Sequence, residues 1–292
     1  MARQSLSRYL ELLPNAGPAL AVRGLCEYEM GDYPQALLDI QRGLASGAAD
    51  GSSNERIVVY HEALLLTAAG AFEDALRVYT SLARFGGGDP EMLAGVGLAG
   101  LRIPLLPKDV NAATQSVATA AGTAAIHYMN GDYPKAEQEF KQLFERYPKT
   151  GNAHYFYGYL LFANDPEQAV AEFKRELEVE PRNAATQVML AWYFLLRDDP
   201  AGALPYAQKA VADTPQSPTG QLVLGRSLAE TSDINGGIEH LKLALNLDPA
   251  NLEIHLALAE AYSRLGRKED ARRERLLSLE LTKGDPNAVV HP

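Results

Sequence analysis

Prolines punctuate the second half of the chain at a nearly constant interval. Pro148, Pro181, Pro215 and Pro249 are separated by 33, 34 and 34 residues. A period near 34 residues is typical of a stack of helical hairpins in which each repeat contacts only its neighbours. The interval therefore predicts a solenoid rather than a single globular core, and stacks of this kind usually function by binding.

Two positions of the repeat are small throughout. With each proline at position 32, five repeats begin at Val117, Gly151, Ala184, Pro218 and Leu252. Position 8 is then occupied by Ala124, Gly158, Ala191, Gly225 and Ala259, and position 20 by Ala136, Ala169, Ala203, Gly237 and Ala271. Small residues at both positions let two antiparallel helices approach closely, and the proline ends the second helix.

This pattern resembles the tetratricopeptide repeat, whose signature is W-x2-L-G-x2-Y, then A-x3-F, then P, over 34 residues. Leu224-Gly225 matches the L-G pair, and Ala136 with Phe140 and Ala169 with Phe173 match A-x3-F. The tryptophan of the signature is absent from position 4 in all five repeats. The resemblance implies an all-α fold, a right-handed α-solenoid of antiparallel helix pairs that forms a superhelix.

The amino-terminal part follows the same pattern less regularly. The sequence GDYPQA at 31–36 nearly duplicates GDYPKA at 131–136, where Asp132 is expected to cap the second helix. Residues 17–89 therefore predict two amino-terminal repeats. Residues 117–283 predict five carboxy-terminal repeats, and residues 284–292 predict a tail.

Two segments depart from the pattern. Residues 1–16 read as the orphan second helix of an upstream repeat: either a divergent capping helix or the start of a truncated chain. Residues 90–116 predict an irregular helix followed by an extended crossing, with Asp109 capping the next helix. Gly95, Gly97 and Gly100 in that helix indicate close packing against another helix. The crossing is either part of a degenerate repeat that bends the solenoid or a segment that enters its groove.

Composition excludes several classes of partner. The net charge of −10 argues against nucleic acid, whose binding needs a basic face. The sequence contains no run of eighteen apolar residues, so it predicts no direct membrane insertion. The single cysteine, Cys26, leaves the compartment open. The chain could be cytoplasmic or, if an upstream signal peptide is missing, periplasmic or secreted.

Catalytic signals are weak. The histidines lack metal-ligand spacing, and the G-x-G-x-x-G match at Gly95 lies in an apolar helix without a preceding strand. We therefore predict no catalytic residues, no metal and no cofactor, and expect that the protein is not an enzyme.

A candidate binding surface follows from the resemblance. In this family the first helix of each repeat lines a concave groove, chiefly at positions 2, 5, 9, 12 and 13. The predicted partner-binding residues are Tyr60, Tyr128, Tyr155, Tyr159, Phe162, Trp192, Leu196 and Arg226. Aromatic residues commonly anchor protein partners. The alternative is that these side chains pack between adjacent repeats or under the chain's own segment 104–108.

Two functional hypotheses remain. The first is a non-enzymatic scaffold that binds a protein or peptide in an aromatic and apolar groove. The second is a regulatory or targeting module of a longer chain whose catalytic or membrane part lies elsewhere. The apolar side of residues 1–14 also predicts weak homo-oligomerisation.

Overall fold

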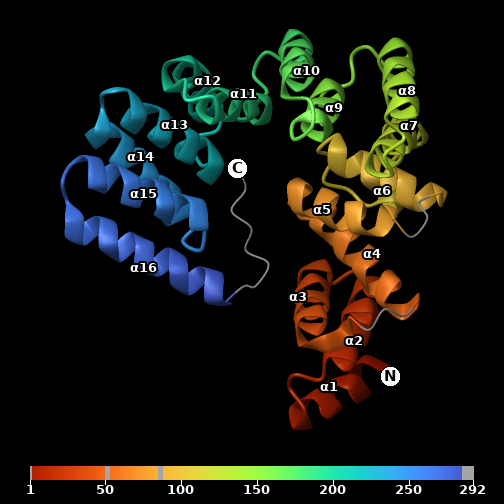
Figure 1. Cartoon of the computed structure of the whole chain (residues 1–292). Helices are drawn as coiled ribbons and strands as arrows, with labels where there is room; N and C mark the ends of the chain where they lie inside the picture. The colour runs from red at the N-terminus through yellow and green to blue at the C-terminus, as the bar shows by residue number, and fades with distance from the viewer. Residues whose placement is uncertain (1, 50–52, 85–87, 285–292) are drawn as a thin grey trace. The chain divides into compact units, whose positions relative to one another are not determined.

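The computed structural model describes residues 2–49, 53–84 and 88–284 (Figure 1). Those residues form sixteen α-helices, one π-helix and one 3-10 helix, without a strand among them. The all-α prediction is therefore confirmed. The chain divides into two compact units, Met1–Leu160 and Leu161–Pro292, called here the N-terminal and C-terminal units.

In the N-terminal unit the helices fold back on one another in sequence order (Figure 1). They are α1 (Ala2–Leu12), α2 (Gly17–Glu29), α3 (Tyr33–Gly43), the π-helix η1 (Leu44–Ala48), α4 (Ser53–Ala68), α5 (Phe72–Ala83), α6 (Pro90–Gly100), the 3-10 helix η2 (Pro107–Asp109), α7 (Ala112–Met129), α8 (Tyr133–Arg146) and α9 (Ala153–Leu161), whose last residue begins the second unit.

The C-terminal unit continues with helix pairs of similar length. Its helices are α10 (Pro166–Val179), α11 (Ala184–Leu196), α12 (Pro200–Asp213), α13 (Pro218–Thr231), α14 (Ile234–Leu247), α15 (Leu252–Arg264) and α16 (Lys268–Gly284). Each periodic proline lies two residues beyond the last residue of helix α8, α10, α12 or α14. The predicted role of these prolines at the ends of second helices is thus confirmed.

Polar caps begin most helices of this unit. The side chain of Asp199 accepts a hydrogen bond from Gly202 N at 2.8 Å, and that of Ser217 accepts one from Gly220 N at 3.0 Å. A proline follows each of these two caps, where the missing N–H costs nothing because that donor has no partner inside the helix. Asp132 caps α8 in the same way, as predicted.

Small residues allow the helix pairs to pack closely. All ten residues at positions 8 and 20 are buried. At the α13–α14 crossing, a Cβ added to Gly225 would lie 2.9 Å from Gly237 O, and one added to Gly237 would lie 2.6 Å from Gly225 O. The close approach inferred from the register is therefore present.

The helix of the irregular segment, α6, approaches its neighbour closely. Helix α6 packs against α7, and a Cβ at Gly97 would lie 1.8 Å from Ala118 O. A Cβ added to Gly122 of α7 would be equally close to Leu93 O, at 1.8 Å. The predicted packing role of the glycines is confirmed. The predicted cap is wrong: Asn111, not Asp109, accepts the hydrogen bond from Thr114 N that begins α7.

Candidate functional site

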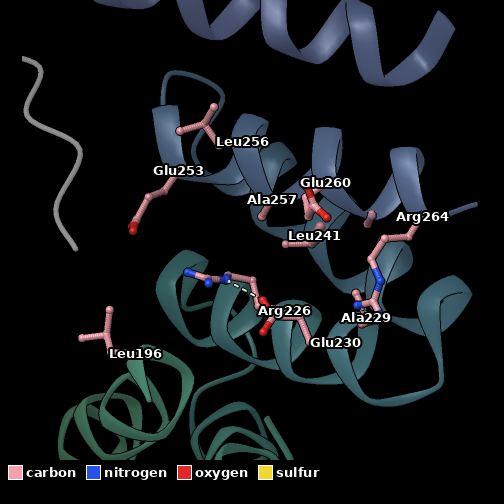
Figure 2. Close-up of a pocket in the computed structure, with 11 residues that line it drawn as sticks. Leu196, Arg226, Ala229, Glu230, Leu241, Glu253, Leu256, Ala257, Glu260 and Arg264 are labelled. Carbon is pink, nitrogen blue, oxygen red and sulfur yellow. Dashed lines mark hydrogen bonds and ion pairs between the residues drawn. The ribbon is translucent and has the colours of Figure 1, made fainter. Parts of the chain in front are cut away.

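A cavity of about 350 Å³ opens between the first helices of successive repeats in the C-terminal unit (Figure 2). Helix α15 contributes six of its lining residues and α13 contributes three, whereas α11 and α14 contribute one each, Leu196 and Leu241. Its residues are Leu196, Arg226, Ala229, Glu230, Leu241, Glu253, Leu256, Ala257, Glu260, Ala261 and Arg264. The cavity combines aliphatic side chains with charged groups.

Arg226 links two of the three first helices. Its guanidinium carbon lies 5.1 Å from the centroid of the Trp192 ring, a cation–π distance. Its Nε also donates to Glu230 Oε1 of the same helix at 3.3 Å. Trp192 is itself half-buried and packs against the hydrophobic clusters on both sides of it. The arginine is thus held beside the cavity by an aromatic ring and a carboxylate.

Carboxylates outnumber cations around the cavity. Glu230, Glu253 and Glu260 face Arg226 and Arg264, and Figure 2 shows Glu253 and Arg226 directed toward the same open space. Burial raises the pKa of Glu253, and the charge of Arg226 opposes that shift. Arg264 donates to the backbone oxygen of Ala229 at 2.5 Å. The arrangement can accept an apolar group beside a cation.

The structure brings three predicted residues together in this unit. Leu196, an exposed side chain, and Arg226 line the cavity, and Trp192 contacts Arg226. Phe162 lies just after α9 and packs on Phe173 of α10, with ring centroids 6.1 Å apart. It is not among the residues that line the cavity.

Tyr155, in the N-terminal unit, is part of the interior. It is 3% exposed, its hydroxyl donates to Glu73 Oε1 at 3.1 Å, and Arg102 donates to the same hydroxyl at 3.3 Å. Burial, together with the nearby Glu73, raises its pKa well above the ordinary tyrosine value. Tyr159 stacks on it with a centroid separation of 6.2 Å. The Tyr155 hydroxyl therefore makes its hydrogen bonds within its own chain.

Tyr60 and Tyr128 occupy different surroundings. Tyr128 lies edge-on to Tyr133, with centroids 4.9 Å apart. Tyr60 packs against a hydrophobic cluster that includes Leu106, and its buried hydroxyl has no hydrogen-bond partner. Burial is the main reason that the pKa of Tyr60 is raised. For Tyr60 the arrangement agrees with the alternative in which aromatic residues pack near the segment between α6 and α7.

Four residues that line the cavity are not among the predicted partner-binding residues, although they occupy groove positions of their repeat. Glu253, Leu256, Glu260 and Arg264 occupy positions 2, 5, 9 and 13 of the repeat that begins at Leu252. These are groove positions of the family. The predicted binding residues are mostly aromatic and lie nearer the centre of the chain, whereas this last repeat is more polar.

Two absences hold for the part of the chain that the structure describes. Within it, no group of three or more His, Cys, Asp or Glu side chains is arranged to hold a metal ion. None of its helices is both long and apolar enough to cross a membrane.

Comparison with protein families identifies the repeats directly. Models described as tetratricopeptide repeat match residues 123–164, 159–218 and 228–275. A comparison with curated proteins gave no match.

Solved structures share the fold at low sequence identity. MamA 41-end from Desulfovibrio magneticus RS-1 is 20% identical with a TM-score of 0.51, covering 58% of this chain and 96% of its own. A MamA RS-1 double mutant is 20% identical with a TM-score of 0.50, covering 57% and 95%. YrrB, described as a tetratricopeptide repeat protein with an unusual peptide-binding site, is 17% identical with a TM-score of 0.47, covering 58% and 87%.

Proposed function

Because this chain belongs to the tetratricopeptide repeat family, we propose that it is a non-enzymatic scaffold whose cavity between α11, α13 and α15 binds a protein or peptide. Stacked helical repeats commonly present such extended surfaces to partners. The proposal concerns the C-terminal unit alone.

The observation that carries it is the convergence of groove positions from three successive repeats on one cavity. Leu196 is position 13 of its repeat, Arg226 is position 9 of the next, and Leu256 is position 5 of the third. Groove side chains that meet at one open cavity form a continuous contact path for an extended or helical peptide. A path across three repeats can engage several side chains of one partner.

The charges of the cavity indicate what the partner carries. Arg226 is paired with Glu230, and Arg264 donates to a backbone oxygen. Three glutamates against two arginines leave the lining with one net negative charge, which can balance an incoming positive charge. Leu196 and Leu256 are both exposed and offer apolar contact. The proposed partner segment therefore combines lysine or arginine with leucine-like side chains.

Fluorescence titration with designed peptides tests this proposal. A twelve-residue peptide of leucine and lysine should change the emission of Trp192, the only tryptophan in the chain, and a matched peptide of leucine and glutamate should not. The variants Leu256→Ala and Glu253→Gln should each weaken binding at least tenfold, about 1.4 kcal/mol. Leu243→Ala, an exposed leucine of α14 outside the cavity lining, is the control.

Two results would contradict the proposal. One is equal affinity for the lysine and glutamate peptides. The other is a loss of binding in Leu243→Ala as large as that in Leu256→Ala, because the contact would then lie elsewhere.

A further inference from the structure

The segment between α6 and α7 lies against helices that bear groove positions of the N-terminal repeats. The chain leaves α6 through Arg102, whose φ of 57° is left-handed, and Ile103 N donates back to Leu98 O at 2.9 Å. Leu106 has an extended backbone, with φ −81° and ψ 152°, and immediately precedes η2. The segment thus crosses in a compact path that ends in a single 3-10 turn.

Leu106 fills an apolar site on α2 and α4. It is 1% exposed and belongs to the cluster that contains Ala21, Tyr28 and Leu64. In the register of the repeats, Ala21 and Tyr28 are positions 5 and 12 of one repeat, and Leu64 is position 9 of the next. These positions line the groove in the family, so Leu106 occupies the place of a partner's side chain.

Lys108 completes the contact through its charge. Its Nζ lies 4.6 Å from the Tyr28 ring centroid and 5.5 Å from that of Tyr33. The ring of His61 meets Tyr28 edge-on at 4.7 Å, which fixes one wall of this aromatic site. An ammonium at these distances from tyrosine faces is attracted by the ring quadrupole. The groove therefore contacts a leucine and a lysine two residues apart.

The backbone hydrogen bonds of the segment are local. Leu105 N donates to Ile103 O at 2.8 Å and Asp109 N donates to Leu106 O at 2.9 Å, both within the segment. Leu106 and Pro107 are buried, whereas Leu105 and Lys108 are exposed. A competing peptide must therefore replace two buried side chains and the cation–π contacts of Lys108 with two tyrosine rings.

We propose that residues 104–109 act as an internal ligand that occupies the groove of the N-terminal repeats. A partner that presents a Leu-Pro-Lys segment in the same conformation binds there by displacing them. The occupied surface comprises Ala21, Tyr28, Tyr33, His61 and Leu64, all within the N-terminal unit. This inference is independent of the cavity proposed for the C-terminal unit.

The test is binding in trans of a labelled peptide with the sequence of residues 103–110, IPLLPKDV, followed by fluorescence anisotropy. The full-length double variant Leu106→Ala, Lys108→Ala should bind it at least tenfold more tightly than the unaltered chain. The same peptide with glutamine in place of its lysine should bind the double variant at least fivefold more weakly than the original peptide.

Circular dichroism establishes whether each protein is folded. Equal binding by the unaltered chain and a folded double variant, or binding by neither, overturns the proposal. If the double variant unfolds, Lys108→Ala alone should give at least a threefold gain. A folded single variant without that gain overturns the proposal as well.

Discussion

The guanidinium carbon of Arg226 lies 5.1 Å from the centre of the Trp192 ring, which joins position 9 of one repeat to position 9 of the next. The same guanidinium holds Glu230 at 3.3 Å. One arginine thus orders an aromatic surface and neutralises a carboxylate beside the cavity. This contact links the structure of two repeats to the proposed binding surface.

Arg226→Ala should expose more of the indole. We expect a red shift of Trp192 emission and stronger quenching by acrylamide, because the stacked guanidinium no longer covers the ring. Helix content should not change. Arg197→Ala is the matched control, since Arg197 lies over Tyr193 at 5.4 Å. Emission that shifts equally in both variants would show that the contact does not control the exposure of the indole.

Gly122→Ala should destabilise the α6–α7 pair by about 1–3 kcal/mol, because the added methyl overpacks a backbone contact. The new Cβ would lie 1.8 Å from Leu93 O and 3.0 Å from Gly97 N. At Gly88 an added Cβ would meet nothing within 4 Å, so Gly88→Ala is the control. Thermal melts of both variants measure the difference, and identical melting temperatures would contradict the close approach.

Gly225→Leu should likewise destabilise the α13–α14 pair by about 1–3 kcal/mol. The first atom of the new side chain would lie 2.7 Å from the Leu241 side chain and 2.9 Å from Gly237 O. Chemical denaturation measures the loss. An unchanged midpoint would mean that the helices can separate without cost, contrary to the packing inferred from positions 8 and 20.

The helix pairs could be predicted because their causes are local. A proline cannot continue a helix, and only small residues fit where two backbones approach, so the proline interval and positions 8 and 20 mark the pairs directly. Phe140, of the A-x3-F pattern, is fully buried as that pattern implies. These signals repeat along the chain, so each occurrence supports the others.

The site could be predicted only in part because its residues depend on distant partners. Tyr155 occupies a groove position, yet it is buried and donates a hydrogen bond to Glu73, 82 residues away. No repeat pattern encodes that pairing. Glu253 and Arg264 could have been predicted from their positions in the repeat, but they are charged and lack the aromatic character that marked the predicted anchors. Aromatic content was therefore a poorer guide than register.

Removing residues 1–14 should lower both stability and any tendency to self-associate. Helix α1 packs on α2, and its Leu10 is 6% exposed. Arg3 Nε lies 3.5 Å from Glu27 Oε1 of α2. Leu12 and Leu13 remain 82% and 52% exposed, which supports weak association through that side. Thermal melts and sedimentation velocity measure the two effects. If neither changes on deletion, α1 has no such role.

Glu27 should make stability fall as pH rises. Its carboxylate is 2% exposed. Burial, with a smaller contribution from Asp39, raises its pKa above the ordinary value of 4.5, while Arg23 and Arg3 oppose the shift. Folding therefore favours the protonated form. The stability that this form contributes is complete below the unfolded pKa, and it is lost as pH rises through the folded pKa.

Glu27→Gln should remove this dependence because glutamine is neutral at every pH. We expect the variant to melt at a higher temperature than the unaltered chain at pH 7, with the difference shrinking toward pH 4. Glu29→Gln, which changes an exposed carboxylate on the same helix, should show no such trend. A Glu27→Gln variant that is less stable at pH 7, and regains equality at pH 4, would mean that the pairs with Arg3 and Arg23 outweigh the cost of burial.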